Sequence, residues 1–261
     1  MGVLMQIPAY ETIKVSFDGT VCTLQIYRPE ANNTINDLFT DECADFLNRH
    51  SEHISVLIIK GLPEVFCFGA DFSAINDNVA DGDPKGQNPE NIYNVWQQIA
   101  NGPFISIAHV RGKANAGGIG FVAACDIVLA EENAVFSLSE LLFGLLPACV
   151  LPFLIRRMGP QKAHYMTMMT QPVSAQRALE WGLVDACEEN SENLLRKHLL
   201  RLTRLSKTAI VRYKKYRAEL DNSLEQQKAC ALKTNLEVFT DPDNLNSISR
   251  YVETGKFPWE K

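Results

Sequence analysis

Residues 111–130, RGKANAGGIGFVAACDIVLA, constrain the fold more than any other stretch of this sequence. They follow an apolar run at 104–110, contain an Ala-Gly-Gly step at 116–118, and end on a second apolar run at 126–130. This order predicts a strand, a glycine turn, a helix and another strand, a crossover unit typical of an α/β fold. The glycines either present backbone N–H groups to an anionic ligand at the helix start or only let the helix pack closely on a strand. Neither a Gly-x-Gly-x-x-Gly pattern nor a Gly-Lys-Ser/Thr pattern is present, so a dinucleotide site and a P-loop are not indicated.

Local signals predict more strands and helices before this unit. Residues 12–27 alternate as a hairpin around Asp18-Gly19, and the apolar run 54–59 is typical of a buried parallel strand. Asn36 can cap a helix that follows it. The polar segment 77–90, rich in Gly and Pro, predicts a loop or lid.

The chain changes character in its last quarter. Ser174 predicts the start of a helix that Gly182 can end, and from about residue 191 the pattern is helical only. We therefore expect an α/β core over residues 1–190. Residues 191–261 should form a C-terminal helical region.

Charge and cysteine usage limit the possible partners. A net charge of −6 argues against nucleic-acid binding, and no apolar run is long enough to span a membrane. The seven cysteines are scattered without a CxxC pair, which indicates neither zinc nor a disulfide framework. The first ten residues lack the features of a secretion signal, so we expect a cytoplasmic protein.

One segment is strongly basic within this acidic chain. Residues 196–217 contain no acid and carry Arg196, Lys197, Arg201, Arg204, Lys207, Arg212, Lys214, Lys215 and Arg217. This basic segment is either a solvated helix face or a surface for an acidic or phosphate-bearing partner.

The candidate chemistry is the stabilisation of an enolate beside one carboxylate. Turns at Ala70 and Gly117 each offer an N–H that could hold a thioester oxygen as negative charge develops on it. Glu140 lies in a mostly apolar setting, where burial would raise its pKa and suit it to proton transfer. Its alternative is a helix N-terminal acid, capped by Ser137 or Ser139.

Other chemistries find less support in the sequence. There is no Gly-x-Ser-x-Gly elbow, and the histidines lack metal-ligand spacing apart from His50 and His53, which resemble an exposed turn. His109, in the strand before the glycines, is expected to be a satisfied core residue. Tyr93 and Lys113 could reach a ligand, or they could be structural and surface residues.

Several motifs in a fixed order resemble the crotonase superfamily, the enoyl-CoA hydratases and isomerases. They are RPEA at 28–31, FGADF at 68–72, Gly117-Gly118, CDI at 125–127, SEL at 139–141, GLLP at 144–147, SAQ at 174–176 and WGLV at 181–184. The resemblance implies two stacked, roughly perpendicular sheets of ββα units and a C-terminal helical region. It also implies homotrimers or hexamers, with residues 191–261 supporting trimerisation or covering the ligand, and an oxyanion hole formed by Ala70 and Gly117.

The resemblance also shapes the expected catalytic set. Hydratases of the superfamily carry two glutamates, one of which matches Glu140, whereas the other matches Gly120. A single glutamate must then handle both proton steps, or a second group must help. Substrate contacts are expected from Ala31, Asp71, Tyr93, Lys113 and Lys214, and no metal or cofactor is expected.

Within the superfamily, the chain is most similar to the dehydratases of polyketide β-branching. The segments YRPEANNTIN at 27–36, GLPEVFCFGADF at 61–72 and TGKFPW at 254–259 carry this similarity. It implies dehydration of 3-hydroxy-3-methylglutaryl on an acyl carrier protein to a 3-methylglutaconyl thioester. The basic segment would then meet the carrier, and Lys113, Arg156 or Arg157 would hold the distal carboxylate.

Two alternatives stay open. The first is an enoyl-CoA isomerase or hydratase that acts on CoA thioesters with the same glutamate. The second is a scaffold or RNA-binding protein without catalysis, against which Glu140, the two turns and the acidic charge argue.

Overall fold

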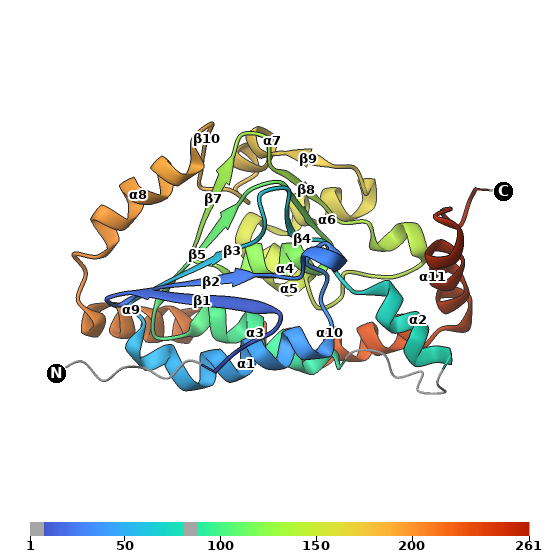
Figure 1. Ribbon diagram of the computed structural model, residues 1–261, viewed down its shortest axis with the longest axis horizontal. Coiled ribbons are helices and arrows are strands. Elements are labelled where there is room, and N and C mark those ends of the chain that lie inside the picture. The colour runs from blue at the N-terminus through green and yellow to red at the C-terminus, as the bar shows by residue number, and fades with distance from the viewer. Residues whose placement is uncertain (1–7, 81–87, 261) are drawn as a thin grey trace.

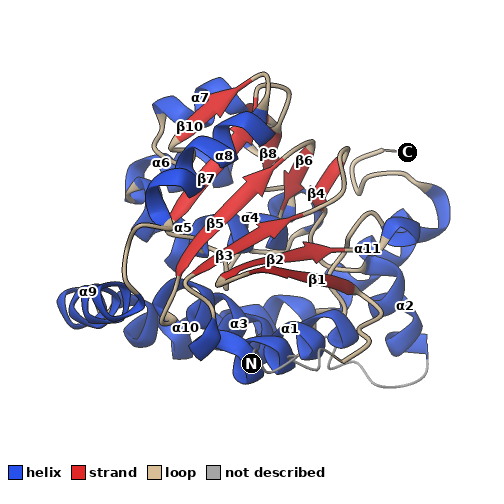
Figure 2. Ribbon diagram, turned by 60° about the vertical axis from the view of Figure 1, so that its left-hand side comes forward, coloured by secondary structure: helices blue, strands red, loops and turns tan. Residues whose placement is uncertain are grey.

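The computed structural model describes residues 8–80 and 88–260, and within them the strands form two sheets (Figure 2). The larger sheet has the order β1-β2-β3-β5-β7-β10, whose strands span Ile13–Asp18, Val21–Ile26, Val56–Lys60, Ile105–Val110, Ile127–Glu131 and Ala186–Glu188. The smaller sheet has the order β4-β6-β8-β9, spanning Val65–Cys67, Lys113–Asn115, Val135–Ser137 and Val173–Ser174. Apart from the antiparallel pairs β1–β2 and β8–β9, neighbouring strands run parallel, as the alternation of strands and helices predicts.

Helices cover both sheets. Those before residue 191 are α1 Asp37–His50, α2 Phe72–Ala80, α3 Pro89–Asn101, α4 Gly117–Ala124, α5 Leu151–Met158, α6 Pro160–Met169 and α7 Ala175–Glu180. The C-terminal set is α8 Ser191–Leu202, α9 Lys207–Leu220, α10 Ser223–Phe239 and α11 Pro242–Thr254. Short 3-10 helices span Pro29–Ala31 (η1), Ser51–His53 (η2) and Glu140–Phe143 (η3). None of the helices among the described residues is both long and apolar enough to cross a bilayer.

The strand β3 shows why this sheet is buried on both faces. Leu57 and Ile59 point into the main hydrophobic core, whereas Val56 and Ile58 pack in a second cluster that includes Leu194 of α8. Side chains alternate across a strand, so a run of apolar residues without polar interruption requires cover on each face.

Helix α4 lies near the centre of the molecule (Figure 1). Every residue of α4 after Gly117 is buried, which explains why its sequence is apolar all round rather than on one stripe. Because α4 follows β6 directly, the glycine turn lies at the edge of the smaller sheet.

Local signals placed most of these elements correctly. The side chain of Asn36 accepts a hydrogen bond from the Phe39 N–H at 2.9 Å and caps α1, and the side chain of Ser174 caps α7. The hairpin is confirmed, but Asp18 pairs with Val21, so its two-residue loop is Gly19-Thr20, one residue later than predicted.

The predicted loop at 77–90 is partly wrong. Helix α2 extends to Ala80, and α3 begins at Pro89 with its cap at Asn88. Residues 81–87 of this segment lie outside the described residues.

The C-terminal helices spread to opposite sides of the core. Both views place α9 at one end of the molecule and α11 at the other, beside α2 (Figures 1 and 2). Helix α11 packs against α2 and η3, and α10 packs against α3 and α5. This arrangement puts α11, and not the basic segment, close to the ends of the smaller sheet.

Candidate active site

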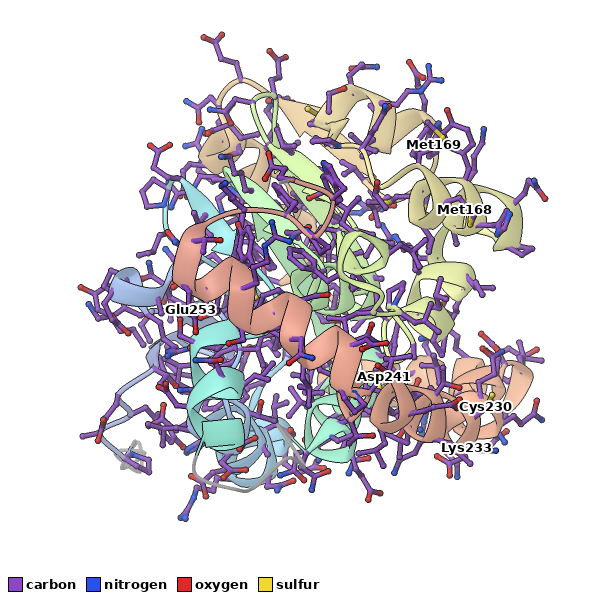
Figure 3. All side chains as sticks on the ribbon, turned by 90° about the vertical axis from the view of Figure 1, so that its right-hand side faces the viewer. Met168, Met169, Cys230, Lys233, Asp241 and Glu253 are labelled. Atoms are coloured by element: carbon purple, nitrogen blue, oxygen red, sulfur yellow. The ribbon has the colours of Figure 1, made fainter. Side chains whose placement is uncertain are left out.

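A cavity of about 910 Å³ lies between the smaller sheet and the C-terminal helices. Its walls include residues of α2, α3, η3, α10 and α11. Figure 3 shows α11 running across this face of the molecule, with Asp241 at its start and Glu253 near its end. Ala31, Ala70, Asp71, Gly117 and Glu140 all line this cavity, so the fold brings five predicted site residues together.

The first donor turn is Gly69-Ala70. An isolated parallel bridge fixes it, because the Ile35 N–H donates to the Gly69 carbonyl at 2.8 Å and the Asp71 N–H donates to the Ile35 carbonyl at 3.0 Å. In a parallel bridge of this kind the N–H of the intervening residue is not used. The Ala70 N–H therefore has no backbone acceptor among the described residues, and Ala70 itself lines the cavity.

The second donor turn is Ala116-Gly117, at the start of α4. Ala116 has φ +49° and ψ −122°, an unusual conformation for a residue other than glycine, and its N–H donates to the Ser137 carbonyl at 3.0 Å. Gly117 is the first residue of α4, so its N–H has no intrahelical acceptor and lies at the positive end of the helix dipole.

The two donor turns are in contact. Gly69 has φ +93°, and a Cβ built on it would lie 2.7 Å from the Ala116 Cβ and 3.3 Å from the Gly117 nitrogen. This close approach requires glycine. It brings the N–H groups of Ala70 and Gly117 into one region of the cavity wall, the arrangement that an oxyanion hole needs.

Glu140 lies beside these donors. It begins η3, three residues after β8, and β8 pairs in register with β6, the strand that leads to Gly117. The side chain is 8% exposed, and its Oε2 atom has no hydrogen-bond partner in the described part of the chain. Burial raises the pKa of Glu140 from 4.5 to about 7, although backbone hydrogen bonds act in the opposite direction. A carboxyl with this pKa can both take and return a proton near neutral pH.

The predicted capping alternative for Glu140 is only half right. Glu140 is the first residue of a short helix, but the side chain of its N-cap residue, Ser139, makes no capping hydrogen bond. The hydroxyl of Ser139 instead accepts a hydrogen bond from Asn115, so it belongs to a different network.

Asn115 connects the donor turns to the carboxylate segment. Its Oδ1 accepts from the Ser137 hydroxyl at 2.7 Å, and its Nδ2 donates to the Ser139 hydroxyl at 3.0 Å. A longer contact of 3.4 Å joins Nδ2 to the Phe68 carbonyl, next to the first donor turn. One buried amide thus holds the segments that carry both N–H donors and Glu140. The role of Asn115 is not visible in the sequence because its partners are distant along the chain.

Asp71 lines the cavity, but its carboxylate has protein partners. Its Oδ2 accepts from Arg28 Nη2 at 3.0 Å and from the Thr34 hydroxyl at 3.1 Å, and its Oδ1 caps the start of α2 at Ala74. These contacts hold Asp71, and with it the first donor turn, in place. The geometry therefore favours a structural role over the predicted substrate contact.

Tyr93 and Lys113 do not line the cavity. The Tyr93 hydroxyl is buried and donates to the Leu224 carbonyl at 2.6 Å, while its ring packs edge-on against Phe153. Lys113 is exposed on β6. The substrate contacts predicted for both residues are not supported, because one side chain is held in the core and the other points to solvent.

Lys214 is also placed away from the cavity. It is 4% exposed, and its Nζ binds both oxygens of Asp126 at 2.6 and 2.7 Å and the Ala100 carbonyl at 2.8 Å. The predicted substrate contact is therefore not supported, since this ammonium is fully occupied in a buried ion pair.

The two arginines expected to hold the distal carboxylate are also paired with acidic residues of the protein. Arg156 pairs with Asp221 at 3.0 Å, and Arg157 pairs with Asp185 and donates to the Asp126 carbonyl. The described residues that line the cavity include no Lys, Arg or His. His109 lies in the core as predicted, but it is only partly satisfied: Nε2 is 3.0 Å from the Ser191 hydroxyl, whereas Nδ1 has no hydrogen-bond partner among the described residues.

Known proteins with similar sequences belong to a family whose chemistry agrees with this geometry. A family model described as enoyl-CoA hydratase/isomerase matches residues 16–261. The chain is 54% identical to the bacillaene synthase dehydratase PksH of Bacillus subtilis, over 98% of this chain and 99% of that protein. It is 32% identical to a mevalonyl-coenzyme A hydratase of Aspergillus fumigatus, over 72% of this chain and 70% of that one.

Solved structures confirm the crotonase fold expected from the sequence. The crystal structure of a polyketide biosynthesis enoyl-CoA hydratase from Bacillus subtilis superposes with a TM-score of 0.94 at 55% identity, covering 96% of this chain and all of that one. An enoyl-CoA hydratase/isomerase from Mycobacterium paratuberculosis superposes with a TM-score of 0.84 at 22% identity, over 92% and 98% of the two chains.

Proposed function

Because this chain belongs to the enoyl-CoA hydratase/isomerase family, we propose that it removes water from a 3-hydroxy-3-methylglutaryl thioester and forms a 3-methylglutaconyl thioester. The substrate is carried by the phosphopantetheine of an acyl carrier protein in polyketide biosynthesis. The similarity to PksH over nearly the whole chain supports a hydratase-like dehydratase of such a pathway.

The proposed reaction begins at the two donor turns. The thioester oxygen accepts hydrogen bonds from the Ala70 and Gly117 N–H groups, which stabilise the negative charge that develops on it. The Glu140 carboxylate removes a proton from C2, and the electron pair is delocalised into the enolate. The C3–O bond then breaks, and the hydroxyl leaves as water with the proton that Glu140 returns.

One observation carries this proposal. Glu140 lines the same cavity as both donor turns, and its Oε2 atom is buried without a hydrogen-bond partner among the described residues. A buried carboxyl oxygen without a hydrogen bond is costly in a purely structural role, and the raised pKa of Glu140 suits a group that must accept and donate a proton in turn.

The distal carboxylate is bound by groups other than the expected basic residues. The described lining of the cavity offers neutral donors such as the Asn235 amide instead of the expected cations. The basic segment lies at the end of the molecule opposite α11, so within one chain it does not meet a substrate at the cavity (Figure 2). Carrier recognition then falls to the surface around α11 and α2.

An assay with two CoA thioesters distinguishes this dehydration from the isomerase alternative. Purified protein is given 3-hydroxy-3-methylglutaryl-CoA or an unbranched 3-enoyl-CoA, and the conjugated enoyl thioester is followed by its ultraviolet absorbance. We expect turnover of the first thioester only. Turnover of the 3-enoyl-CoA alone would replace dehydration by isomerisation.

A further inference from the structure

The cavity has a second buried polar atom without a partner, the indole nitrogen of Trp96. Among the described residues, Glu140 and Trp96 alone both line the cavity and have a buried side-chain polar atom without a hydrogen bond. Trp96 is only 2% exposed. An unsatisfied buried donor is uncommon and costs free energy, so it needs an explanation.

The indole is held rigidly from α3. It packs edge-on against Phe121 of α4 at 5.8 Å and against Phe153 of α5, also at 5.8 Å. These contacts place the indole between α4 and α5, at the wall of the cavity.

The indole lies directly against α4. A Cβ built on Gly120 would overlap Cζ2, Cε2 and Cη2 of Trp96 at 2.4, 2.6 and 2.6 Å, and one built on Gly117 would lie 3.9 Å from Cζ2. The atom Cε2 is bonded to the indole nitrogen. Gly120 thus leaves room for the indole, whose nitrogen lies near Gly120 in the helix that the second donor turn begins.

We propose that the Trp96 N–H donates a hydrogen bond to the 3-hydroxyl oxygen of the substrate and is a catalytic residue for its departure. This inference rests on the proposed dehydration. A thioester oxygen bound at the donor turns places C3 only two carbons from the thioester carbonyl carbon, so the 3-hydroxyl lies nearer to Gly117 than the distal carboxylate does. The indole keeps its own proton, and Glu140 supplies the proton that leaves with the hydroxyl as water.

The hydrogen bond can be tested separately from turnover. In a Glu140→Gln background, which keeps the substrate intact, we would measure binding of 3-hydroxy-3-methylglutaryl-pantetheine and of 3-methylglutaryl-pantetheine, which lacks only the hydroxyl. With Trp96 present, we expect the hydroxylated probe to bind about tenfold more tightly. Replacing the residue by benzothienylalanine, which has the same shape but sulfur in place of N–H, should abolish this difference. Trp96→Phe should do the same, and Trp181→Phe, outside the cavity lining, is the control.

The outcomes distinguish this inference from the proposed function. If the benzothienylalanine protein still prefers the hydroxylated probe, or binds the probe without the hydroxyl more weakly than the Trp96 protein does, Trp96 packs the cavity or holds the carboxylate and the inference is wrong. If the native protein dehydrates no thioester, the proposed function fails whatever Trp96 binds. With Glu140 present, the loss of the N–H should also lower kcat about tenfold.

Discussion

Glu140 and Trp96 have opposite chemical capacities at one site. The glutamate can accept and release a proton, whereas the indole only donates a hydrogen bond. Both are buried, and each has one polar atom without a partner among the described residues. A substrate that carries a hydroxyl two carbons from a thioester carbonyl supplies a partner for each of them.

Glu140→Gln should lower kcat by about 10³-fold and leave Kd for the pantetheine thioesters within about threefold, because the amide keeps the shape but cannot take a proton. Glu30→Gln is the matched control. It lines the same cavity, but its side chain is 69% exposed, so its turnover should be unchanged. Steady-state kinetics and calorimetry measure the two effects. Undiminished turnover in Glu140→Gln would exclude this glutamate as the base.

The pKa of Glu140 predicts a distinctive pH dependence. Burial raises this pKa from 4.5 to about 7, and the base is the carboxylate, so kcat/KM should rise with pH and level off above about 7. The folded state holds a proton between pH 4.5 and 7 that the unfolded chain has released. Stability is therefore lost as pH rises through this window, by about 3 kcal/mol in total.

Glu140→Gln should not show this loss. Urea unfolding of both proteins at pH 5 and pH 8 measures the difference: the variant should gain about 3 kcal/mol relative to the native protein at pH 8 and little at pH 5. An equal difference at the two pH values would mean that Glu140 is not protonated in this range.

At the scale of elements, the site depends on two turns that touch. Gly69→Ala would place a methyl group 2.7 Å from the Ala116 Cβ at a positive φ, and it would push the donor turns apart. We expect kcat to fall about 10²-fold, as for the loss of one oxyanion donor. Gly182→Ala has a similar positive φ of +80° but meets nothing within 4 Å, so it should lose some stability and keep its kcat. Equal kcat values in the two variants would contradict the role of the first donor turn.

Elements with strong local signals were predictable from the sequence. The hairpin, the capped helix α1 and the crossover unit around α4 follow from turn residues, a capping side chain and apolar runs. The strands β4, β6 and β8 have only three residues each, and their pairing depends on partners far along the chain. Helix α2 runs into a polar segment because tertiary contacts with α11 outweigh its weak local preference.

The site residues also divide into those with a local sequence signal and those that depend on distant contacts. Ala70, Gly117 and Glu140 were predicted because glycine turns and a carboxyl in an apolar setting are visible in the sequence. Asn115 and Trp96 were not, since their significance depends on contacts between segments that only the fold brings together. Tyr93, Lys113 and Lys214 were expected at the substrate, but the first and last have partners in the core and the second is exposed.

At the scale of the whole molecule, a buried ion pair joins the C-terminal helices to the core. Lys214→Met would leave Asp126 without its cation and should lower the free energy of unfolding by about 3 kcal/mol, with kcat per folded molecule unchanged. Lys215→Met, at the exposed neighbouring position, should change stability by less than about 0.5 kcal/mol. Weaker thioester binding without a loss of stability would restore the substrate contact predicted for Lys214.

Intact-protein mass spectrometry of a loaded acyl carrier protein tests the central claim most directly. The carrier bears 3-hydroxy-3-methylglutaryl on its phosphopantetheine and is incubated with the native protein, with Glu140→Gln, or alone. Only the native protein should reduce the carrier's mass by one water, and it should do so faster than it converts the CoA thioester. No mass loss with the native protein, or equal loss with Glu140→Gln, would contradict dehydration by this site.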